Sequence, residues 1–582
     1  MTGSFPERVA ARVRSLARRF LLFTLVVIGA LCGVVAVLFH HAVELARTFL
    51  IGRAVEGHGV VRIVLILLIP TVTFALLAAA IRRFAPRAVG ANLARVRMAY
   101  NRDTALLSPR SIVATFVATP LSLGAGAPMG PEGPIVVITS GVSAAVARLL
   151  QLPRKLVRGM IPVGVAAGIA AIFNTPITGV VFAVEEVFGA SERGLLGGVL
   201  VGAVAAAVVE RLLLGGQSVL AAPTSTWRDA RELIGFAILG VAAGVVSGFA
   251  IAVTHRLKRA WARVMPSMVL RAALAGALIG AFGLIVPSIL GVGYDSVSFW
   301  LHGGSSASQT ALAFTMKTLG FIVAIAGGVL GGTFAPSLFM GAALGSAIGH
   351  SAVLLFPAAG IDPKAYSIVG MGCFFAGLLR SPIAAVLIAV ELTRDYDLIV
   401  PLMLAVSLAV SISRRISPLS IVEQQMVDEG FVEEHEASDP LAGVLVADAM
   451  SAGPVTVGAD ATLREAAQLV AGTHHPFYPV VDAGGVLSGV VARVAIERGL
   501  ADGDAEGSVR PLIEAPRLVL AVDENVVDAV HRMQLEGVDR CAVIDGESSR
   551  RVVGFLSPSD ILRARMAHSA RSEDELPFEV FS

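Results

Sequence analysis

The chain has 582 residues, of which 55% are hydrophobic and 15% charged, and its mean hydropathy is +0.77. This composition excludes an ordinary soluble globule, so most of the chain should lie in lipid. The charge divides in two, because residues 1–420 carry a net +18 and residues 421–582 carry a net −16. A basic membrane part is therefore followed by an acidic, more water-compatible part. The three cysteines are scattered and imply no disulfide framework.

The amino-terminal segment, residues 1–19, carries five arginines ahead of the first apolar run. The positive-inside rule places such a segment in the cytoplasm. Arg414 and Arg415 follow the last apolar run and place the acidic part on the same side. We therefore expect both ends of the chain to be cytoplasmic.

Apolar runs of two lengths follow one another through the basic part. The long ones can each cross about 30 Å of hydrocarbon; they cover residues 20–39, 60–81, 111–127, 195–214, 233–254, 269–291, 310–331 and 396–413. The shorter ones, several of them broken by glycine or proline, cover residues 134–150, 162–173, 176–188, 337–356, 366–379 and 382–392. A broken backbone is tolerated at membrane depth only where it lines a cavity enclosed by protein. The pattern predicts a polytopic α-helical membrane protein that contains re-entrant or broken helices.

A single carboxylate interrupts the apolar sequence in "GAPMGPEGP", residues 126–134. A charged side chain at the bilayer centre costs about 2.5–3.5 kcal/mol on the insertion scale. Glycine and proline before an apolar run signal a helix start, and Pro131 suits the first helical position. Glu132 should then lie in the first turn, where free N–H groups and the helix dipole favour an anion. One dipole contributes at most about 2 kcal/mol, so further donors are needed.

Two segments repeat along the chain. "TPITGVVFAVE" (175–185) and "SPIAAVLIAVE" (381–391) match at six of eleven positions. A glycine- and proline-containing break precedes each of them, "GPEGP" (130–134) and "GGTFAP" (331–336). Interrupted helices at corresponding places in two halves indicate a binding site at the bilayer midplane.

Two helix starts that met at the midplane would form a site for an anion. Backbone amides, and not lysine or arginine, would hold the anion, because a full countercharge would trap it whereas partial charges let it leave. Glu132 would occupy this site when no anion is bound, and would swing away or take a proton when one arrives. We therefore interpret the carboxylate as a tethered competitor for the anion.

From about residue 446 the chain changes to short strands that alternate with helices. Residues 446–500 and 509–567 each predict strand, helix, strand, glycine-containing turn, strand and helix. This is a soluble α/β repeat of about 60 residues per unit. Residues 421–445 are interpreted as a linker, and residues 568–582 as an acidic tail.

Four motifs resemble the CLC family of chloride channels and chloride/proton antiporters: "GPEGP", "GGTFAP", "AAGIAAIFNTPITGVVFAVEEV" and "GMGCFFAGLLRSPIAAVLIAVELTRDYDLIVP". They lie within residues 20–420, in the family's order and spacing. The resemblance implies a homodimer in a bacterial inner membrane. Each subunit would have its own pore, built from two inverted halves at residues 20–215 and 230–420. Glu132 matches the family's gating glutamate, and the matching anion-coordinating amides are those of Glu132, Gly133, Thr333 and Phe334.

Three further glutamates lie at the ends of the repeated segments or directly after them. Glu186 matches the family's intracellular proton-relay glutamate, which channel members usually replace with an uncharged residue. Its presence favours proton coupling, and the alternative is a solvated glutamate at a helix end. Glu185 and Glu391, which the repeat relates, are expected to be structural and to accept hydrogen bonds from helix ends.

Three positions depart from the family's pattern. Ala91 stands where the family has a serine whose hydroxyl helps to hold the central anion, and Ser420 stands where it has the pore tyrosine. Pro131 replaces an arginine and has no N–H to offer. Each lost hydrogen bond to a charged ligand is worth about 1.5–3 kcal/mol, so losing two would weaken the central site by about 100-fold or more. Weak central binding goes with loose or absent coupling in this family, and some bacterial branches prefer other anions, fluoride among them.

The two soluble units resemble a tandem pair of CBS domains. The second ends in "GFLSPSDIL", close to the family's Gly-x-x-Ser/Thr-x-x-Asp pattern. The resemblance implies that Asp560 binds the ribose hydroxyls of an adenine nucleotide and that Ser557 lies near its phosphates. The first unit has Ala492 and Ala495 at these places, so the same contact is not expected there. The alternative is a purely structural pair that stabilises the dimer.

Two transport modes remain open. The carboxylate pair favours proton-coupled chloride antiport. Ala91 and the shorter hydroxyl of Ser420, in place of the family's serine and tyrosine, favour a passive, voltage- or ligand-gated chloride channel or a transporter of another anion. An intramembrane metalloprotease would need His-Glu-x-x-His, and the chain offers only "HHAVE" at 40–44. The adjacent His474 and His475 have no third ligand for a metal. We predict no catalytic residue, no metal site, no required cofactor and no nucleic-acid partner; the expected partners are a small anion, protons, lipid and a second subunit.

Overall fold

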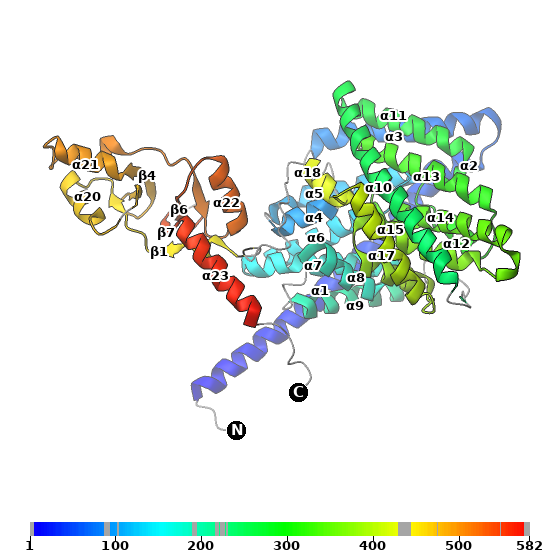
Figure 1. Ribbon diagram of the computed structural model, residues 1–582, viewed down its shortest axis with the longest axis horizontal. Helices are drawn as coiled ribbons and strands as arrows, with labels where there is room; N and C mark the ends of the chain where they lie inside the picture. Colours follow the sequence, from blue (N-terminus) through cyan, green and yellow to red (C-terminus); the bar gives the residue numbers. More distant parts are fainter. Residues whose placement is uncertain are drawn as a thin grey trace. The chain divides into compact units, whose positions relative to one another are not determined.

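The computed structural model of the protein describes residues 5–85, 93–101, 104–188, 195–215, 220, 227, 231–428, 441, 444–473, 475–546 and 549–574. The chain divides into two compact units, Met1–Val432 and Glu433–Ser582. Figure 1 follows both units from the N-terminus to the C-terminus, and each is a separate body with a core of its own.

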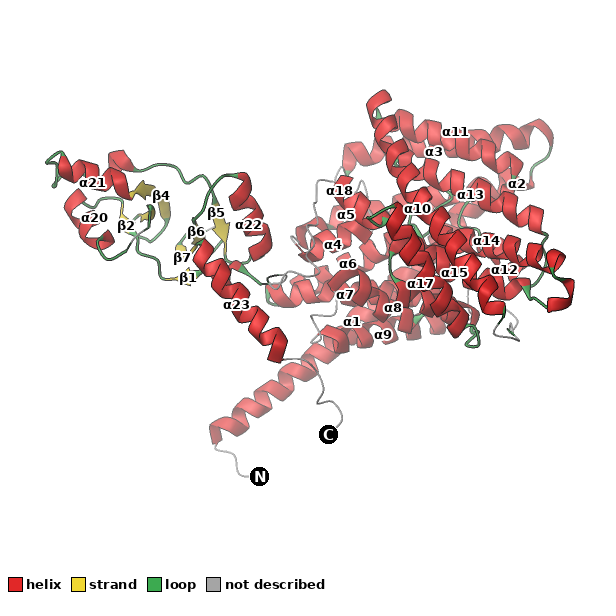
Figure 2. Cartoon of the chain, in the orientation of Figure 1, coloured by secondary structure: helices red, strands yellow, loops and turns green. Residues whose placement is uncertain are grey.

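The described part of the first unit is built from helices (Figure 2). Those before residue 230 are α1 Phe5–Arg47, α2 Arg53–Glu56, α3 Gly59–Phe84, α4 Leu93–Asn101, α5 Pro109–Gly124, α6 Glu132–Leu149, α7 Arg154–Phe173, α8 Pro176–Ala183 and α9 Leu196–Leu214. Those after it are α10 Glu232–Val264, α11 Met268–Ile285, α12 Tyr294–Leu301, α13 Ala307–Gly327, α14 Phe334–Leu355, α15 Pro363–Leu379, α16 Pro382–Thr393, α17 Ile399–Ile416 and α18 Ile421–Asp428. Short π or 3-10 turns lie between them: η1 Thr48–Gly52, η3 Thr104–Leu106, η4 Val184–Phe188, η6 Pro287–Ile289 and η7 Pro357–Ala359.

Ten helices among the described residues are long and apolar enough to cross a membrane. This confirms the predicted polytopic helical membrane fold. Two runs that are short in the sequence, 134–150 and 337–356, lie in helices of spanning length, α6 with 18 residues and α14 with 22. Both helices are longer than their apolar runs because each begins inside its glycine- and proline-containing break, α6 at Glu132 and α14 at Phe334.

Glycines let the helix backbones of this unit approach one another closely, as is typical of helices packed in membranes. On α14, a Cβ added at Gly345 would lie 1.9 Å from the backbone oxygen of Tyr366 on α15. On α10, a Cβ added at Gly240 would lie 2.4 Å from the backbone oxygen of Ala405 on α17. The high glycine content of the chain therefore serves helix packing as well as turns.

The repeated segments form the short helices α8 and α16, and a glutamate at the end of each repeat binds the start of the other helix. The hydrogen bonds run from backbone N–H groups to carboxylate oxygens: Ile177 (3.1 Å) and Thr178 (2.7 Å) donate to Glu391, and Ile383 (3.0 Å) and Ala384 (2.8 Å) donate to Glu185. Each carboxylate satisfies free N–H groups at a helix start and lies at the favourable end of its dipole. The structural role expected for Glu185 and Glu391 is confirmed.

The second unit carries two small sheets with helices beside them (Figure 2). One sheet has the strand order β2-β3-β4 and the other the order β1-β7-β6-β5. The strands are β1 Ser451–Ala452, β2 Val457–Gly458, β3 Phe477–Val481, β4 Leu487–Ala492, β5 Val519–Ala521, β6 Cys541–Ile544 and β7 Val552–Leu556. The helices are α19 Val446–Ala449, α20 Leu463–Val470, α21 Arg493–Ala501, α22 Val526–Leu535 and α23 Pro558–Asp574, with the 3-10 turn η9 Arg510–Leu512.

Both halves of this unit follow the predicted order of elements. The first half runs β2, α20, β3, β4, α21 and the second runs β5, α22, β6, β7, α23, with one parallel and one antiparallel strand pair in each. Strand β1 was not predicted. Ser451 pairs with Phe555 and Ala452 with Gly554, so a strand from the beginning of the first half completes the sheet of the second.

Candidate functional site

The two glycine- and proline-containing breaks meet. Gly130 and Gly332 form an antiparallel bridge. The nitrogen of Gly130 lies 2.9 Å from the oxygen of Gly332, and the nitrogen of Gly332 lies 2.5 Å from the oxygen of Gly130. A Cβ added at Gly332 would lie 2.5 Å from the backbone nitrogen of Gly133, so only glycine fits there. The bridge brings the N-termini of α6 and α14 together, and with them N–H groups that have no partner within their own helices. This is the arrangement that the sequence predicted.

Glu132 occupies the space between these two helix starts. Its side chain is fully buried, and one carboxylate oxygen accepts a hydrogen bond from the backbone N–H of Ala335 at 3.3 Å. The other oxygen accepts one from the hydroxyl of Tyr294. A Cβ added at Gly130 would collide with the carboxylate, which lies over this glycine. An anion held by the same helix starts would compete with Glu132 for this place.

The other predicted anion-site residues lie at the same two helix starts. Gly133 follows Glu132 in the first turn of α6, and Pro131 is the N-cap residue of that helix, with no side-chain cap. Thr333 is the N-cap residue of α14, and Phe334 is its first residue. The Phe334 ring packs edge-on against two other rings, with centroid distances of 4.7 Å to Phe182 and 5.1 Å to Phe375.

Two residues near Glu132 were missed in the sequence. One is Tyr294, the first residue of α12. The other is Lys317 on α13, whose side chain is fully buried and whose ammonium group binds backbone oxygens of the segment just before Tyr294. The expectation that no lysine or arginine holds the anion still stands as a prediction, because the Lys317 ammonium group donates to backbone oxygens of Ile289, Gly291 and Val292. The signal was present in the sequence, because a lone lysine within an apolar spanning run is itself an indication of function.

Glu186 lies in the π-helical turn η4 and is buried, with 5% of its surface exposed. Single π turns inside helices are frequent at functional sites. The Ser381 hydroxyl donates a hydrogen bond to one carboxylate oxygen, and a guanidinium nitrogen of Arg97 lies 3.7 Å from the other. Among the described residues that second oxygen has no hydrogen-bond donor. Burial contradicts the alternative of a solvated glutamate at a helix end.

The positions that depart from the family's pattern have different outcomes. Ala91 lies outside the described residues. Ser420 is buried, and its hydroxyl accepts a hydrogen bond from the N–H of Glu423 at 3.1 Å, while the Glu423 carboxylate accepts one from the N–H of Ser420 at 2.6 Å. This reciprocal pair is a capping box at the start of α18. The Ser420 hydroxyl is therefore used by its own helix.

In the second unit, Asp560 lies in the first turn of α23 and is buried. One carboxylate oxygen accepts hydrogen bonds from the backbone N–H (2.9 Å) and the hydroxyl (2.5 Å) of Ser557. The other accepts from the Ser451 hydroxyl at 2.7 Å and from Arg563 at 3.1 Å. The two residues predicted to bind a nucleotide are thus in contact, and they cap a helix in this structure.

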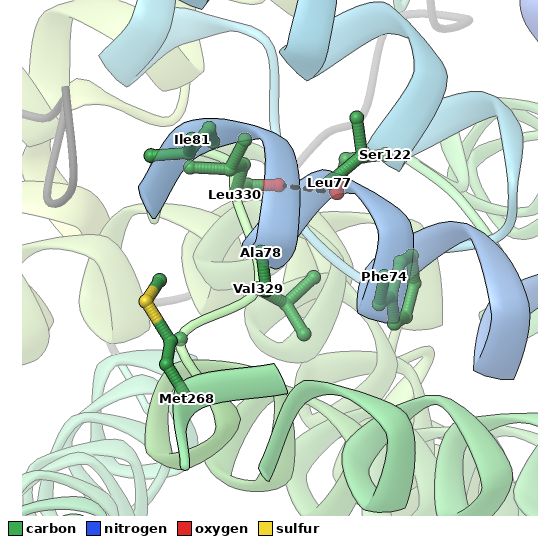
Figure 3. Close-up of a pocket in the computed structure, with 9 residues that line it drawn as sticks. Phe74, Leu77, Ala78, Ile81, Ser122, Met268, Val329 and Leu330 are labelled. Atoms are coloured by element: carbon green, nitrogen blue, oxygen red, sulfur yellow. Dashed lines mark hydrogen bonds between the residues drawn. The ribbon is translucent and has the colours of Figure 1, made fainter. Parts of the chain in front are cut away.

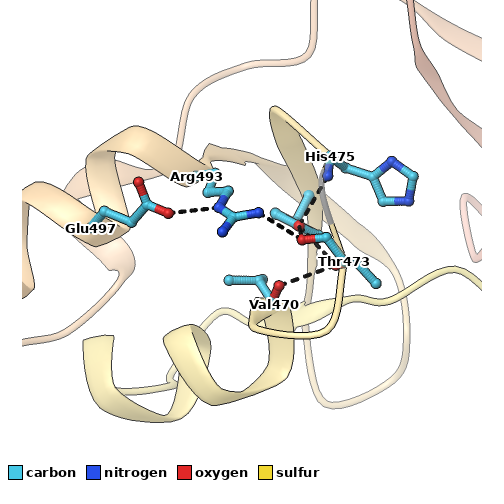
Figure 4. Close-up of polar contacts among 6 residues, drawn as sticks. Val470, Thr473, His475, Arg493 and Glu497 are labelled. Atoms are coloured by element: carbon cyan, nitrogen blue, oxygen red, sulfur yellow. Dashed lines mark hydrogen bonds and ion pairs between the residues drawn. The ribbon is translucent and has the colours of Figure 1, made fainter.

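The histidine-containing turn of the first CBS-like unit is held by polar contacts (Figure 4). Arg493 donates to the backbone oxygen of Thr473 at 2.7 Å and to Glu497 at 2.6 Å, and the N–H of His475 donates to the Tyr478 hydroxyl at 3.3 Å. The hydrogen bond to Glu497 raises the pKa of the Arg493 guanidinium above its usual value. His474 lies outside the described residues. Within the described ranges no three histidine, cysteine, aspartate or glutamate side chains form a group that could hold a metal.

A small cleft lies beside the second break (Figure 3). The Ser122 hydroxyl crosses it to donate to the backbone oxygen of Leu330 at 2.8 Å. Its lining is uncharged and consists of Phe74, Leu77, Ala78, Ile81, Ser122, Met268, Gly328, Val329 and Leu330. Such a lining offers an anion little in exchange for its hydration, so this cleft is not a second anion site.

Comparisons with known proteins agree with this geometry. The sequence profile described as voltage gated chloride channel matches residues 72–414, and the CBS domain profile matches residues 446–501 and 509–567. A Ralstonia nicotianae protein named as a ClcB-like candidate chloride channel is 34% identical over 304 residues, which are 52% of this chain and 71% of that protein. The H+/Cl− exchange transporter ClcA of Klebsiella pneumoniae is 28% identical over 396 residues, 66% of this chain and 83% of that protein.

Solved structures show the same fold. A slow cyanobacterial Cl−/H+ antiporter matches with a TM-score of 0.66 and 25% identity, over 70% of this chain and 97% of that chain. A eukaryotic CLC transporter matches with a TM-score of 0.65 and 18% identity, over 93% of this chain and 97% of that chain. The profile match covers more than half of the chain, and the predicted resemblance is confirmed: this chain belongs to the voltage gated chloride channel (CLC) family and carries two CBS domains after its membrane part.

Proposed function

We propose that this protein exchanges chloride for protons across a membrane, along a path that Glu132 gates. The observation that carries the proposal is the position of the Glu132 carboxylate, buried between two helix N-termini that suit an anion. The relatives named as an H+/Cl− exchange transporter and a Cl−/H+ antiporter support it. The protein acts as a transporter and not as an enzyme.

In the proposed cycle, chloride and the Glu132 carboxylate compete for the same backbone N–H groups. Chloride enters when Glu132 leaves, and Glu132 leaves more readily once it has taken a proton, because a neutral carboxyl gains less from the helix dipoles. The amides of Glu132, Gly133, Thr333 and Phe334 are proposed to hold the anion. Since these donors carry only partial charge, the anion can leave again.

Glu186 is proposed to pass protons between the cytoplasm and Glu132. Its burial disfavours the charged form, while Arg97 and Ser381 favour it, and such opposed effects are typical of a group that gains and loses protons. We further propose a homodimer in a bacterial inner membrane, with both ends of the chain in the cytoplasm. The five arginines before residue 20 and Arg414 with Arg415 support that orientation.

The test is a joint recording of chloride efflux and external pH from liposomes that hold the purified protein. We expect an outward chloride gradient to drive proton uptake against a proton gradient. Chloride flux without proton movement would instead establish a passive channel. In the helix cap the Ser420 hydroxyl only accepts a hydrogen bond, from the N–H of Glu423, so its own O–H is still available as a donor. If chloride is not moved, the recording is repeated with fluoride and nitrate.

The CBS pair is proposed to bind an adenine nucleotide through Asp560 and Ser557. For this the Asp560 carboxylate would exchange its Ser451 partner for ribose hydroxyls. In the full-length protein, we expect ATP at 100 times its dissociation constant to stabilise the CBS pair by about 2.7 kcal/mol, measured as a rise in the melting temperature of that pair. Asp560→Asn should remove this rise, and Asp460→Asn, which changes an exposed surface carboxylate, should keep it. A wild-type protein that ATP does not stabilise would have a purely structural pair.

A further inference from the structure

Tyr294 stands where it can hold the gate. It is the first residue of α12, and its ring packs edge-on against Phe173 with a centroid distance of 6.3 Å. Its hydroxyl donates a hydrogen bond to one oxygen of Glu132, while the N–H of Ala335 donates to the other. The two carboxylate oxygens are therefore held from two different helices, α12 and α14. Of these two donors, the hydroxyl is the one that a side-chain substitution can remove.

Lys317 fixes the segment that leads to Tyr294. Its ammonium group, which has three N–H donors, lies within hydrogen-bond distance of three backbone oxygens, those of Ile289 (3.0 Å), Gly291 (2.6 Å) and Val292 (3.2 Å). The same group lies 4.7 Å from the ring centroid of Phe339 on α14. The lysine thus binds the end of the turn that joins α11 to α12 and also contacts the helix that carries Ala335.

The residue between this segment and Tyr294 has to be a glycine. Gly293 has a φ of +91°, in the left-handed region that favours glycine. A Cβ there would lie 2.6 Å from the Phe339 ring and 3.5 Å from the Lys317 nitrogen. The backbone just before Tyr294 is therefore packed against Phe339 and bound by Lys317.

We propose that Tyr294 is a positioning residue of the gate, a latch whose hydroxyl holds Glu132 in the anion path, and that Lys317 anchors this latch. The inference rests on the proposed function, because it assumes that Glu132 and the anion compete. It adds a determinant of anion affinity that lies outside the two helix starts. Among the described residues, the groups that donate to the Glu132 carboxylate are the Tyr294 hydroxyl from α12 and a backbone N–H from α14.

The latch predicts the direction of a change in anion affinity. A hydrogen bond to a carboxylate stabilises the state in which Glu132 blocks the path, so its removal weakens the competitor and not the anion. Tyr294→Phe keeps the ring and removes only the hydroxyl. We expect the half-saturating chloride concentration for transport to fall by about 10-fold or more, as for the loss of one hydrogen bond to a charged group.

The experiment is a double-mutant cycle in liposomes: half-saturating chloride is measured for the wild type, Tyr294→Phe, Glu132→Ala and the double variant. If the hydroxyl acts through Glu132, Tyr294→Phe lowers the value in the wild-type background and leaves it unchanged in the Glu132→Ala background. Tyr366→Phe is the matched control, since it removes a hydroxyl from a buried tyrosine on α15 that packs against Phe236, and it should leave the value unchanged.

The possible failures are distinguishable. If Tyr294→Phe leaves the half-saturating chloride concentration unchanged, or changes it equally in both backgrounds, the latch proposal is wrong. The role of Glu132 as the gate is not affected by that result. An unchanged value in Glu132→Ala itself overturns the competition on which the proposed function rests. Lys317→Met adds a test of the anchor and should shift the value in the same direction as Tyr294→Phe. If Lys317→Met does not fold, the Tyr294→Phe and Tyr366→Phe variants still test the latch proposal.

Discussion

Glu132→Ala should abolish proton movement while chloride flux persists. The substitution removes the titratable group between the two helix starts and leaves their backbone N–H groups in place. Chloride then has no tethered competitor, and no carboxylate remains there to carry a proton into the path. We expect proton uptake driven by a chloride gradient to fall to the level of protein-free liposomes, recorded together with chloride efflux.

Two further variants make this result specific. Glu132→Gln keeps the shape of the side chain, but the amide cannot take up and release a proton as the carboxylate does. This variant should lose proton movement in the same way. Glu210→Ala removes another buried carboxylate, on α9 and outside the two helix starts, and should leave coupling intact. Proton pumping that survived in Glu132→Ala would rule out the role given to this residue, whatever the chloride flux.

The sequence was informative about Glu132 because local chemistry and global pattern agree there. Glycine and proline mark the helix start, a lone carboxylate in an apolar run demands donors, and the second break at a matching place supplies them. The contact of Gly130 with Gly332 is made by backbone atoms alone, and the repeat predicted it. The reciprocal binding of helix starts by Glu185 and Glu391 followed from the same repeat. Pairs related by internal symmetry are thus predictable over about 200 residues of sequence.

Tyr294 and Lys317 were not predictable in the same way. Tyr294 is the first residue of α12 and Lys317 lies on α13, and neither has a counterpart in the repeat that we identified. Tyr294 contacts Glu132, and Lys317 binds the segment before Tyr294, only because the chain folds back on itself. Strand β1 was not predicted for a similar reason. A two-residue strand has no periodicity, and its partner lies about 100 residues further along the chain. A lone lysine within a spanning helix can nevertheless be recognised in the sequence as an indication of a functional residue.

Gly332→Ala should disable transport although it changes no polar group. The added methyl group would lie 2.5 Å from the backbone nitrogen of Gly133 and 3.1 Å from the backbone oxygen of Gly130. Both neighbours are backbone, so the starts of α6 and α14 must move apart. Displacements of about 1 Å at a functional centre can reduce rates by about 100-fold, and we expect chloride flux to fall by a factor of this order.

Overpacking of this kind costs about 1–3 kcal/mol, which a large membrane unit with many helix contacts can tolerate, so the variant should still be recovered as folded protein. Gly197→Ala is the matched control, because a Cβ at this helical position on α9 would meet open space and alanine favours helix by about 1 kcal/mol. It should transport at the wild-type rate. Folded Gly332→Ala protein with wild-type flux would show that the anion path does not depend on the contact between the two helix starts. If Gly332→Ala loses chloride flux while Gly197→Ala keeps it, and the elution and intrinsic fluorescence of Gly332→Ala are unchanged, the anion path runs between the starts of α6 and α14. At that place Gly130 and Gly332 allow the two helix N-termini to meet.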